Sequence, residues 1–244
     1  MGNELQLVDV SLESPALNLA LDEALLEQCE AAEGAGGVLR FWRTADYFVV
    51  VGYGNRVGAE VDVAACGAAG MPVLRRCSGG GTVLQGPGCL NYALVLPVAE
   101  SGPLASITGT NEFVMERNRE AVAGLVGQPV RIEGHTDLAV AGRKFSGNSQ
   151  RRRRRCLLFH GTFLLGFELR LIGRVLRPPT REPAYRQGRG HGDFVMNLPV
   201  AEEVLRAALR RVWGAQNEMK NPPVALAREL AAARYGNDEW NRRL

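Results

Sequence analysis

The sequence predicts an α+β fold in which helices pack on one mixed or largely antiparallel sheet. Strand-like and helix-like segments follow one another without the strict alternation of a doubly wound parallel sheet. The run YFVVVGY (47–53) is apolar on both faces, as a central strand covered on both sides should be. No internal repeat and no long linker divides the 244 residues, so a single domain spanning 1–244 is expected.

The first element is predicted to be a helix that begins after Ser14. Ser14 can cap this helix, Pro15 suits its first turn, and Gly34 follows its end. Apolar residues share one face of it at helical spacing: Leu17, Leu21, Ala24 and Leu25.

Extended segments dominate the next sixty residues. Strands are predicted for VLRFWR (38–43), YFVVVGY (47–53), PVLRR (72–76) and CLNYALVLP (89–97), with a short helix or turn over 60–70. Proline ends the last of these strands.

The second half mixes both kinds of element. Helical patterns cover 107–126, 169–176, 201–213 and 224–235, and strands are predicted for 129–133 and 156–165. DLAVAGRKFSGNSQ (137–150) reads as a hairpin with Ala141 and Gly142 at its turn. The irregular stretch 177–194 is expected to be a surface loop.

Composition narrows the function classes. Lys plus Arg number 29 and Asp plus Glu 26, a net charge of +3, which excludes a strongly basic nucleic-acid protein. No apolar run reaches the roughly 18 residues of a membrane span, and the first residues lack the pattern of a secretory signal. The five cysteines form no C-x-x-C pair and are expected to be reduced thiols in a cytoplasmic protein: Cys29, Cys66, Cys77, Cys89 and Cys156.

The stretch RRCSGGGTV combines fixed positive charge with conformational freedom. Gly79, Gly80 and Gly81 allow positive φ and close approach of a ligand to the backbone N–H groups. The pattern matches neither common nucleotide fingerprint, so the glycines alone indicate a turn or a ligand cradle. The guanidinium groups of Arg75 and Arg76 favour a carboxylate or phosphate ligand.

A second cluster surrounds Lys144. A lone lysine is usually a solvated charge. Lys144, however, lies among the small residues Gly142, Ser146 and Gly147, and can instead be directed at an anion or a polarised carbonyl.

Other chemistry-bearing residues carry weaker signals. The five arginines 151–155 are interpreted as a solvated loop rather than a nucleic-acid contact, because no aromatic residues interleave. The three histidines lack metal-ligand spacing. Cys77 and Cys89 lie near the arginines, where a thiolate would be stabilised, but packing in the core is the commoner fate of a cysteine.

In chain order, these segments resemble the lipoate–protein ligase family, within the larger group of biotin ligases and octanoyltransferases. The resemblance rests on NLALDEALL, RRCSGGGTV, TDLAVAGRKFSGNSQ, LLFHGTFLL and YGNDEWNRRL. It implies a catalytic domain related to biotin ligases and class II synthetases, in which lipoate or octanoate reacts with ATP, in the presence of Mg²⁺, to give an acyl-adenylate. A lysine of a lipoyl-domain protein, such as a 2-oxoacid dehydrogenase E2 or a glycine cleavage H-like protein, then takes the acyl group.

The resemblance also implies roles for particular residues. Lys144 is expected to be catalytic, contacting the carbonyl and phosphate oxygens. Asp137 is a possible Mg²⁺ or nucleotide ligand, and Val83 and Leu158 are expected to wall the hydrocarbon tail. The residues expected to bind lipoyl-AMP are Asp22, Arg75, Arg76, Ser78, Gly79, Gly80, Gly81, Thr82, Val83, Asp137, Ser146, Gly147 and His160.

Three departures from the family pattern leave alternatives open. The family's Asn-Asp pair reads Thr136-Asp137, and no cysteine stands just upstream of the lysine segment, where cysteine-dependent octanoyltransferases carry their nucleophile. The accessory domain of many ligases is not evident before residue 244, so a separate accessory chain is a possible partner. Acyl transfer from a carrier protein or a preformed acyl-adenylate, a biotin ligase, and a non-catalytic nucleic-acid-binding module are the alternatives to a complete ligase.

Overall fold

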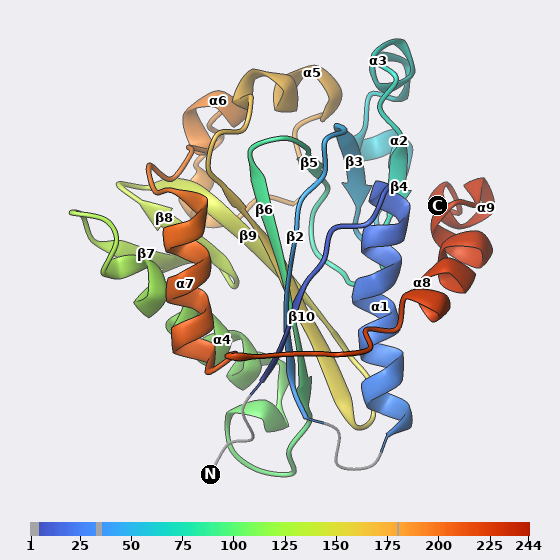
Figure 1. Cartoon of the computed structure of the whole chain (residues 1–244). Helices are drawn as coiled ribbons and strands as arrows, with labels where there is room; N and C mark the ends of the chain where they lie inside the picture. The colour runs from blue at the N-terminus through green and yellow to red at the C-terminus, as the bar shows by residue number, and fades with distance from the viewer. Residues whose placement is uncertain (1–4, 33–35, 180) are drawn as a thin grey trace.

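The computed structural model describes residues 5–32, 36–179 and 181–244 and shows an α+β fold (Figure 1). An eight-stranded, mostly antiparallel sheet has the order β11-β1-β2-β6-β10-β9-β8-β7. A second sheet of three strands, β4-β3-β5, stands beside it. The predicted class and the large sheet flanked by helices are confirmed, whereas the expectation of one sheet is corrected by this second one.

The strands lie close to their predicted ranges where the sequence contains a long apolar run. Their bounds are β1 Gln6–Asp9, β2 Val38–Trp42, β3 Phe48–Val51, β4 Val73–Arg75, β5 Val83–Gln85, β6 Cys89–Pro97, β7 Val130–Glu133, β8 Asp137–Val140, β9 Arg143–Arg152, β10 Cys156–Leu164 and β11 Asn217–Glu218. The short strands β1, β5 and β11 were not predicted.

The helices are α1 Pro15–Ala31, α2 Val57–Glu60, α3 Val63–Ala68, α4 Ile107–Ala123, α5 Ile172–Val175, α6 His191–Phe194, α7 Glu202–Trp213, α8 Val224–Leu230 and α9 Asp238–Asn241, with shorter turns η1 Pro103–Ala105, η2 Leu169–Leu171, η3 Ala184–Arg186 and η4 Ala231–Tyr235. The predicted cap of α1 is confirmed, since Ser14 Oγ accepts a bond from the Leu17 N–H at 3.3 Å. Gly34, expected just past this helix, lies outside the described residues.

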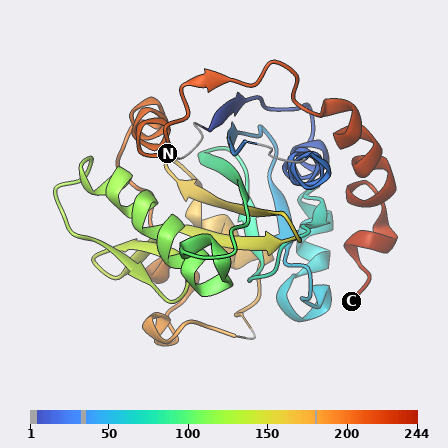
Figure 2. The same cartoon turned by 90° about the horizontal axis from the view of Figure 1, so that it is seen from below.

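Helices cover both faces of the large sheet (Figures 1 and 2). Helices α1 and α8 pack on one face and α4 and α7 on the other, with a separate apolar cluster on each side. The central strand β6 pairs with β10 over nine residues, and β2 and β9 pair with the outer edges of these two strands.

The small sheet is closed by the C-terminal segment of the chain. Strand β3 is its buried central strand, as the two-faced apolar run predicted. At the outer edge of β4, the Arg75 N–H donates to Asn241 Oδ1 at 2.9 Å, and Trp240 Nε1 donates to the Arg75 carbonyl at 2.8 Å. These bonds satisfy backbone groups that an open edge would leave unpaired.

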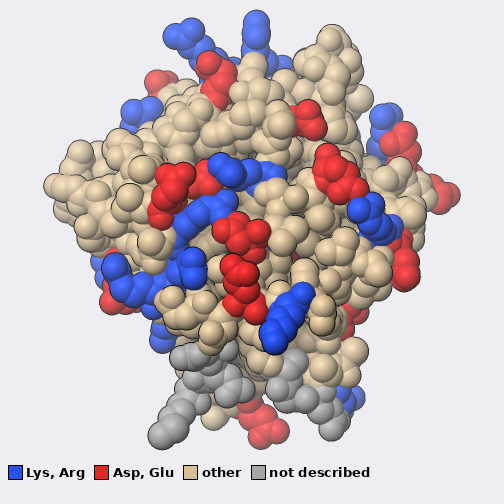
Figure 3. All heavy atoms as spheres, viewed as in Figure 1, with Lys and Arg blue, Asp and Glu red and all other residues tan. Residues whose placement is uncertain are grey.

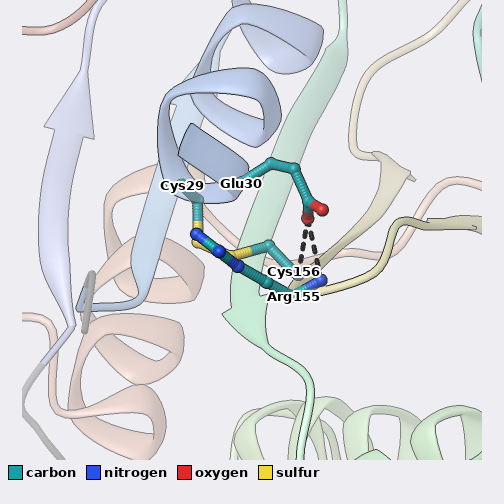
Figure 4. Close-up of a disulfide and its surroundings, with 4 residues drawn as sticks. All are labelled: Cys29, Glu30, Arg155 and Cys156. Atoms are coloured by element: carbon teal, nitrogen blue, oxygen red, sulfur yellow. Dashed lines mark hydrogen bonds between the residues drawn. A yellow bond between two sulfur atoms is a disulfide. The ribbon is translucent and has the colours of Figure 1, made fainter. Parts of the chain in front are cut away.

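The cysteines differ from the prediction. Cys29, near the end of α1, and Cys156, at the start of β10, form a disulfide across 127 residues of sequence (Figure 4). The neighbouring Glu30 carboxylate accepts bonds from the Arg155 and Cys156 N–H groups at 2.9 and 3.0 Å. Reduced thiols were expected at all five positions, so this prediction was wrong for Cys29 and Cys156.

The arginine run is largely built into the fold rather than being a solvated loop. Arg151 donates to the Cys77 carbonyl at 2.9 Å, Arg152 donates to the Leu104 carbonyl at 2.6 Å, and Arg153 forms an ion pair with Glu27. On the face viewed in Figure 3, basic and acidic side chains lie side by side rather than in a continuous basic stripe. Among the described residues, no helix is long and apolar enough to cross a membrane.

Candidate active site

A cavity of about 840 Å³ lies on the α1 face of the large sheet, between that sheet and the small one. Its floor is formed by side chains of β2, β6, β10 and β9. Side chains of α1, β3 and β5 close one end, and residues of 177–179 and 181–194 close the other. The loop from Cys77 to Thr82, here called the glycine loop, lines the side.

Strand register aligns the floor in two rows. Directly opposite residues of neighbouring strands share a face and lie about 5 Å apart. One row runs Trp42, Asn91, Thr162, Gly147 and Asp137, from β2 to β8. The other, two residues along each strand, runs Arg40, Ala93, His160 and Ser149.

Lys144 reaches the floor by lying across Gly147. A Cβ at Gly147 would stand 2.6 Å from Lys144 Nζ, so only glycine leaves room for the side chain in this position. Lys144 Nζ pairs with Asp137 Oδ1 at 2.7 Å, and Tyr185 donates to the other oxygen of this carboxylate at 2.8 Å. An ammonium has three donors, so the pair with Asp137 leaves donors for a ligand in the cavity.

The predicted hairpin gives Lys144 this placement. Ala141 and Gly142 both have positive φ, at 50° and 73°, which is the geometry of a tight turn with a type I′ twist. A register shift at Leu138 and Ala139 then alters the alternation of side chains on this edge of the sheet.

A buried chain of polar groups supports the second row. Arg40 pairs with Asp22 at 2.5 Å, and the other oxygen of Asp22 lies 3.2 Å from His160 Nδ1. Because that carboxylate accepts from Nδ1–H, His160 Nε2 accepts from the Ser78 hydroxyl at 2.6 Å. Ser78 in turn accepts from Arg76 Nε at 3.0 Å, so the chain connects α1 and β10 to the glycine loop.

Arg76 braces the glycine loop from inside. Besides Ser78, it donates to the carbonyls of Gly79 and Gly81, and burial lowers the pKa of its guanidinium to about 10. With those carbonyls turned inward, the backbone N–H groups of residues 79–82 have no backbone acceptor among the described residues. A loop that exposes successive N–H groups suits an anion or an activated carbonyl.

The loop is also held from its other side. A Cβ at Gly52 would stand 2.1 Å from the Gly80 carbonyl oxygen, so the loop packs directly on the end of β3. Asn55 donates to the Gly80 carbonyl at 3.0 Å and to Glu60 at 2.8 Å, and the Thr82 hydroxyl donates to the same Glu60 carboxylate.

Arg75 lies apart from the cavity, in contrast to the expected contact with phosphate. Its side chain is fully buried, and its guanidinium donates to the carbonyls of Gly52, Tyr53, Asn55 and Trp240. The structure therefore places Arg75 where it fixes the C-terminal segment to the end of β3, and of these two neighbouring arginines it is Arg76 that lines the cavity.

Most of the other residues predicted for the site lie together around the cavity. The cavity lining includes Asp22, Arg76, Gly80, Gly81, Thr82, Val83, Asp137, Lys144, Ser146, Gly147 and His160. Ser78 does not line the cavity itself but is hydrogen-bonded to His160, which does. Gly79 and Leu158 are not among the lining residues.

The donor set fits a resident metal poorly. No group of three His, Cys, Asp or Glu side chains among the described residues could hold a metal ion. Both oxygens of Asp137, the expected Mg²⁺ ligand, already have protein partners in Lys144 and Tyr185. Mg²⁺ brought by nucleotide phosphates needs few protein ligands, but no protein cage for it is present in this part of the chain.

The stretch 177–194 was expected to be a surface loop; most of its described residues, 177–179 and 181–194, are at least partly exposed, and several of them also close one end of the cavity. Arg177, Arg181, Arg186 and His191 line that end, and Tyr185 reaches Asp137. Burial and the neighbouring Arg186 lower the pKa of His191. Three arginines line this end of the cavity, with Glu182 beside Arg186 as a counter-charge, and the excess of positive charge favours a phosphate-bearing ligand.

The lining residues that the sequence analysis missed include two pairs on the floor of the cavity, Trp42 with Asn91 and Gln85 with Thr162. A signal existed for two of them. Asn91 is the one amide in the apolar run CLNYALVLP, and Thr162 follows His160 at the two-residue spacing that puts both on one face of a strand.

Comparison with known proteins gives a consistent result. Residues 14–207 match the model of the lipoyl protein ligase A/B catalytic domain. A protein of *Aeropyrum pernix* called "Putative lipoate-protein ligase A" is 34% identical over 83% of this chain and 72% of its own length. "Octanoyltransferase LipM" of *Symbiobacterium thermophilum* is 29% identical over the full length of both chains.

Solved structures share the fold. A lipoate-protein ligase A bound with ATP is 25% identical, with a TM-score of 0.80 and 99% coverage of both chains. The bi-partite lipoate protein ligase of *Thermoplasma acidophilum*, studied with its E2 lipoyl domain, has a TM-score of 0.83 at 24% identity, covering 98% of this chain and 96% of that one. With the cavity, its lysine and its glycine loop, these matches show that the chain belongs to the lipoyl protein ligase A/B catalytic domain family, as an enzyme of the lipoyl ligase and transferase class.

Proposed function

We propose that this protein activates lipoate, or a related medium-chain acid, with ATP and transfers the acyl group to a lysine of a lipoyl-domain protein. The observation that carries the proposal is the position of Lys144 between two unlike halves of one cavity. Leu19, Trp42 and Val50 line the half toward β2, and arginines line the half under the segment 177–194.

This division matches the two parts of an acyl-adenylate. The hydrocarbon tail is accommodated by the apolar half, and the nucleotide by the basic half. The junction between them, where carbonyl and phosphate meet, falls at Lys144 and the glycine loop.

The reaction requires two transfers at that junction. First, a carboxylate oxygen of the acid attacks the α-phosphorus of ATP, and pyrophosphate leaves. Then the amine of the acceptor lysine attacks the acyl carbon, loses a proton and expels AMP. Lys144 is placed to stabilise negative charge on the phosphate oxygens in the first step and on the carbonyl oxygen in the second.

Cysteine-dependent transfer is disfavoured by the state of the thiols. Cys29 and Cys156 are joined in a disulfide, and Cys66, Cys77 and Cys89 are buried. Burial raises the pKa of Cys77 and of Cys89 to about 12, so neither supplies a thiolate at neutral pH. None of the five cysteines is among the residues that line the cavity.

Replacing Cys77 by alanine is therefore expected to leave the acylation rate within about threefold of wild type, because the thiol fills space in the core rather than carrying the acyl group. The measurement is the initial rate with ATP, lipoate and a lipoyl domain, combined with intact mass after exposure to octanoyl-carrier protein. An acyl adduct on wild type that disappears with Cys77→Ala would instead support a transferase.

The partners are proposed by analogy with the relatives. A lipoyl domain of an E2 or H-like protein supplies the acceptor lysine. The bi-partite ligase of *Thermoplasma acidophilum* is a precedent for a separate accessory chain.

The proposal is tested by incubating the protein with ATP, Mg²⁺, lipoate and a purified lipoyl domain and recording intact mass. A lipoyl mass gain that requires ATP is expected. Gain only with octanoyl-carrier protein, and none with ATP and free acid, would overturn it. If synthetic lipoyl-adenylate alone serves as donor, the activation half of the proposal fails and the transfer half stands.

A further inference from the structure

A phenol outside the cavity reaches the ion pair at the junction of its two halves. The Tyr185 hydroxyl, from the turn η3, donates to Asp137 Oδ2 at 2.8 Å, and Lys144 Nζ holds the other oxygen of this carboxylate at 2.7 Å. Asp137 and Lys144 are among the residues that line the cavity, whereas Tyr185 is not. Any effect of this hydroxyl on the reaction therefore passes through Asp137.

The chain just after Tyr185 also holds the backbone of Lys144. The Met196 N–H donates to the Lys144 carbonyl at 2.8 Å, and Arg143 Nη2 donates to the Val195 carbonyl at 2.8 Å. These bonds fix the point from which the lysine side chain extends, while Tyr185 fixes the carboxylate with which that side chain pairs.

Tyr185 itself is held in one orientation. Its ring packs on Phe194, with the two ring centroids 5.1 Å apart, and its carbonyl accepts a bond from Arg189 Nη2 at 2.7 Å. Burial, together with the nearby Asp137 carboxylate, raises the pKa of the phenol. The hydroxyl therefore keeps its proton at neutral pH and remains a donor to Asp137.

The two partners of Asp137 differ in charge and in freedom. Lys144 lies across Gly147, which has no side chain, so its flexible stem can turn the ammonium from Asp137 to the oxygens of a ligand. That turn takes the cation from a carboxylate that stands beside a negatively charged ligand. A hydroxyl bound to the carboxylate makes a strong charge-assisted bond, and its one proton does not compete with Lys144 for the charge of the ligand.

We propose that Tyr185 is a positioning residue for the reaction, because its hydroxyl holds the Asp137 carboxylate while the Lys144 ammonium turns to the oxygens of the reacting acid and phosphate. The inference rests on the proposed function, which brings those oxygens to Lys144. Negative charge on them grows along the reaction, so the ammonium leaves Asp137 most completely in the transition state. The contribution of Tyr185 is then larger in the transition state than in the ground state.

Tyr185→Phe tests this role, because it removes one hydroxyl and keeps the ring on Phe194. With ATP, Mg²⁺, lipoate and a lipoyl domain, kcat is expected to fall about tenfold or more, as for the loss of a hydrogen bond to a charged group. KM for lipoate and the Kd of ATP, measured by calorimetry, should change by less than about threefold. A fall in kcat without a rise in KM is the mark of an interaction that strengthens in the transition state.

Tyr235→Phe is the matched control. The Glu23 carboxylate lies between Arg234 Nη1 at 2.6 Å and the Tyr235 hydroxyl at 2.7 Å, which is the same arrangement of cation, carboxylate and phenol. None of these three residues is among those that line the cavity. Because Tyr235 is fully buried, its variant is expected to lose more thermal stability than Tyr185→Phe while it keeps the wild-type kcat.

A second background separates action through Asp137 from direct contact with the ligand. Asp137→Asn removes the negative charge that Tyr185 stabilises, so adding Tyr185→Phe to this variant should change kcat by less than about threefold. A loss of about tenfold or more that persists in this background would mean that Tyr185 acts on the ligand itself, and it would overturn the inference.

A wild-type kcat in Tyr185→Phe overturns the inference and leaves the proposed function intact. An equal loss of kcat in Tyr235→Phe also overturns it, since both hydroxyls would then act through the stability of the fold. If only synthetic lipoyl-adenylate serves as donor, the same comparison of kcat is made on the transfer step. If wild type acylates the lipoyl domain with neither donor, the proposed function fails and the inference fails with it.

Discussion

Replacing Lys144 by alanine is expected to lower the rate of lipoyl transfer by at least about 10²–10³-fold, with the fold preserved. The ammonium lies at the junction of the two halves of the cavity, and the variant removes it without a substitute. Lys144 is also partly exposed, with 24% of its side chain accessible, so its loss leaves no large void in the core.

The variant leaves Asp137 without its cationic partner, although Tyr185 still donates to that carboxylate. Loss of such a partly exposed ion pair is expected to lower the free energy of unfolding by about 1 kcal/mol or less. Initial rates of acylation, measured by intact mass of the lipoyl domain, should therefore fall far more than stability does.

The chain offers a matched control, because its other lysine is Lys220, an exposed residue outside the cavity. Lys220→Ala should retain the wild-type rate. Near-wild-type acylation by Lys144→Ala would show that the reacting oxygens do not lie at Lys144. It would also contradict the placement of the acyl tail and the nucleotide on either side of this residue.

The elements that could be predicted from sequence are those specified by local pattern. The strand 89–97 was predicted with its observed ends, since a nine-residue run that is almost entirely apolar stops at a proline. The hairpin turn at Ala141 and Gly142 was specified by its small residues. By contrast, β1 and β11 pair with each other across some two hundred residues, and neither has a pattern of its own.

Part of the site could be predicted because it, too, is specified by local sequence patterns. The glycine loop and Lys144 stand in compact motifs, and the structure brings them together. Arg75 and Arg76 are indistinguishable as neighbours in sequence, yet alternation at the end of β4 sends Arg75 toward the C-terminal segment and Arg76 toward the cavity. Which arginine faces the ligand depends on the fold around them.

The hydrogen-bonded group of Gln85, Asn91 and Thr162 shows this limit more clearly. Gln85, Asn91 and Thr162 belong to three different strands, and only the register of β5, β6 and β10 against their neighbours makes one polar group of them. The disulfide is a second case, since its two cysteines lie 127 residues apart with no spacing pattern.

Breaking this disulfide is expected to produce the largest loss of stability among single changes outside the cavity. The bridge joins α1, which carries Asp22 and Leu19, to β10, which carries His160 and Thr162. A cross-link that closes a loop of this length restricts the unfolded chain by about 4–5 kcal/mol in the chain-entropy account. For a protein of this size, that corresponds to a fall in Tm of roughly 8–20 °C.

The signature that separates the bridge from ordinary packing is non-additivity. Cys29→Ala and Cys156→Ala each break the same bond, so either single variant should lose most of what the double variant loses. Reductant should lower the Tm of wild type toward that of the variants and leave the Tm of the variants unchanged.

Cys66→Ala is the control, because it removes a buried thiol that forms no bridge; it should cost only the small packing loss of one sulfur atom. Two single variants whose losses simply add, in a wild type that does not respond to reductant, would mean that the two sulfurs contribute by packing alone. Neither cysteine lines the cavity, so the double variant should keep its activity when it is assayed well below its Tm. The bridge then stabilises the fold that holds the site and takes no part in the reaction.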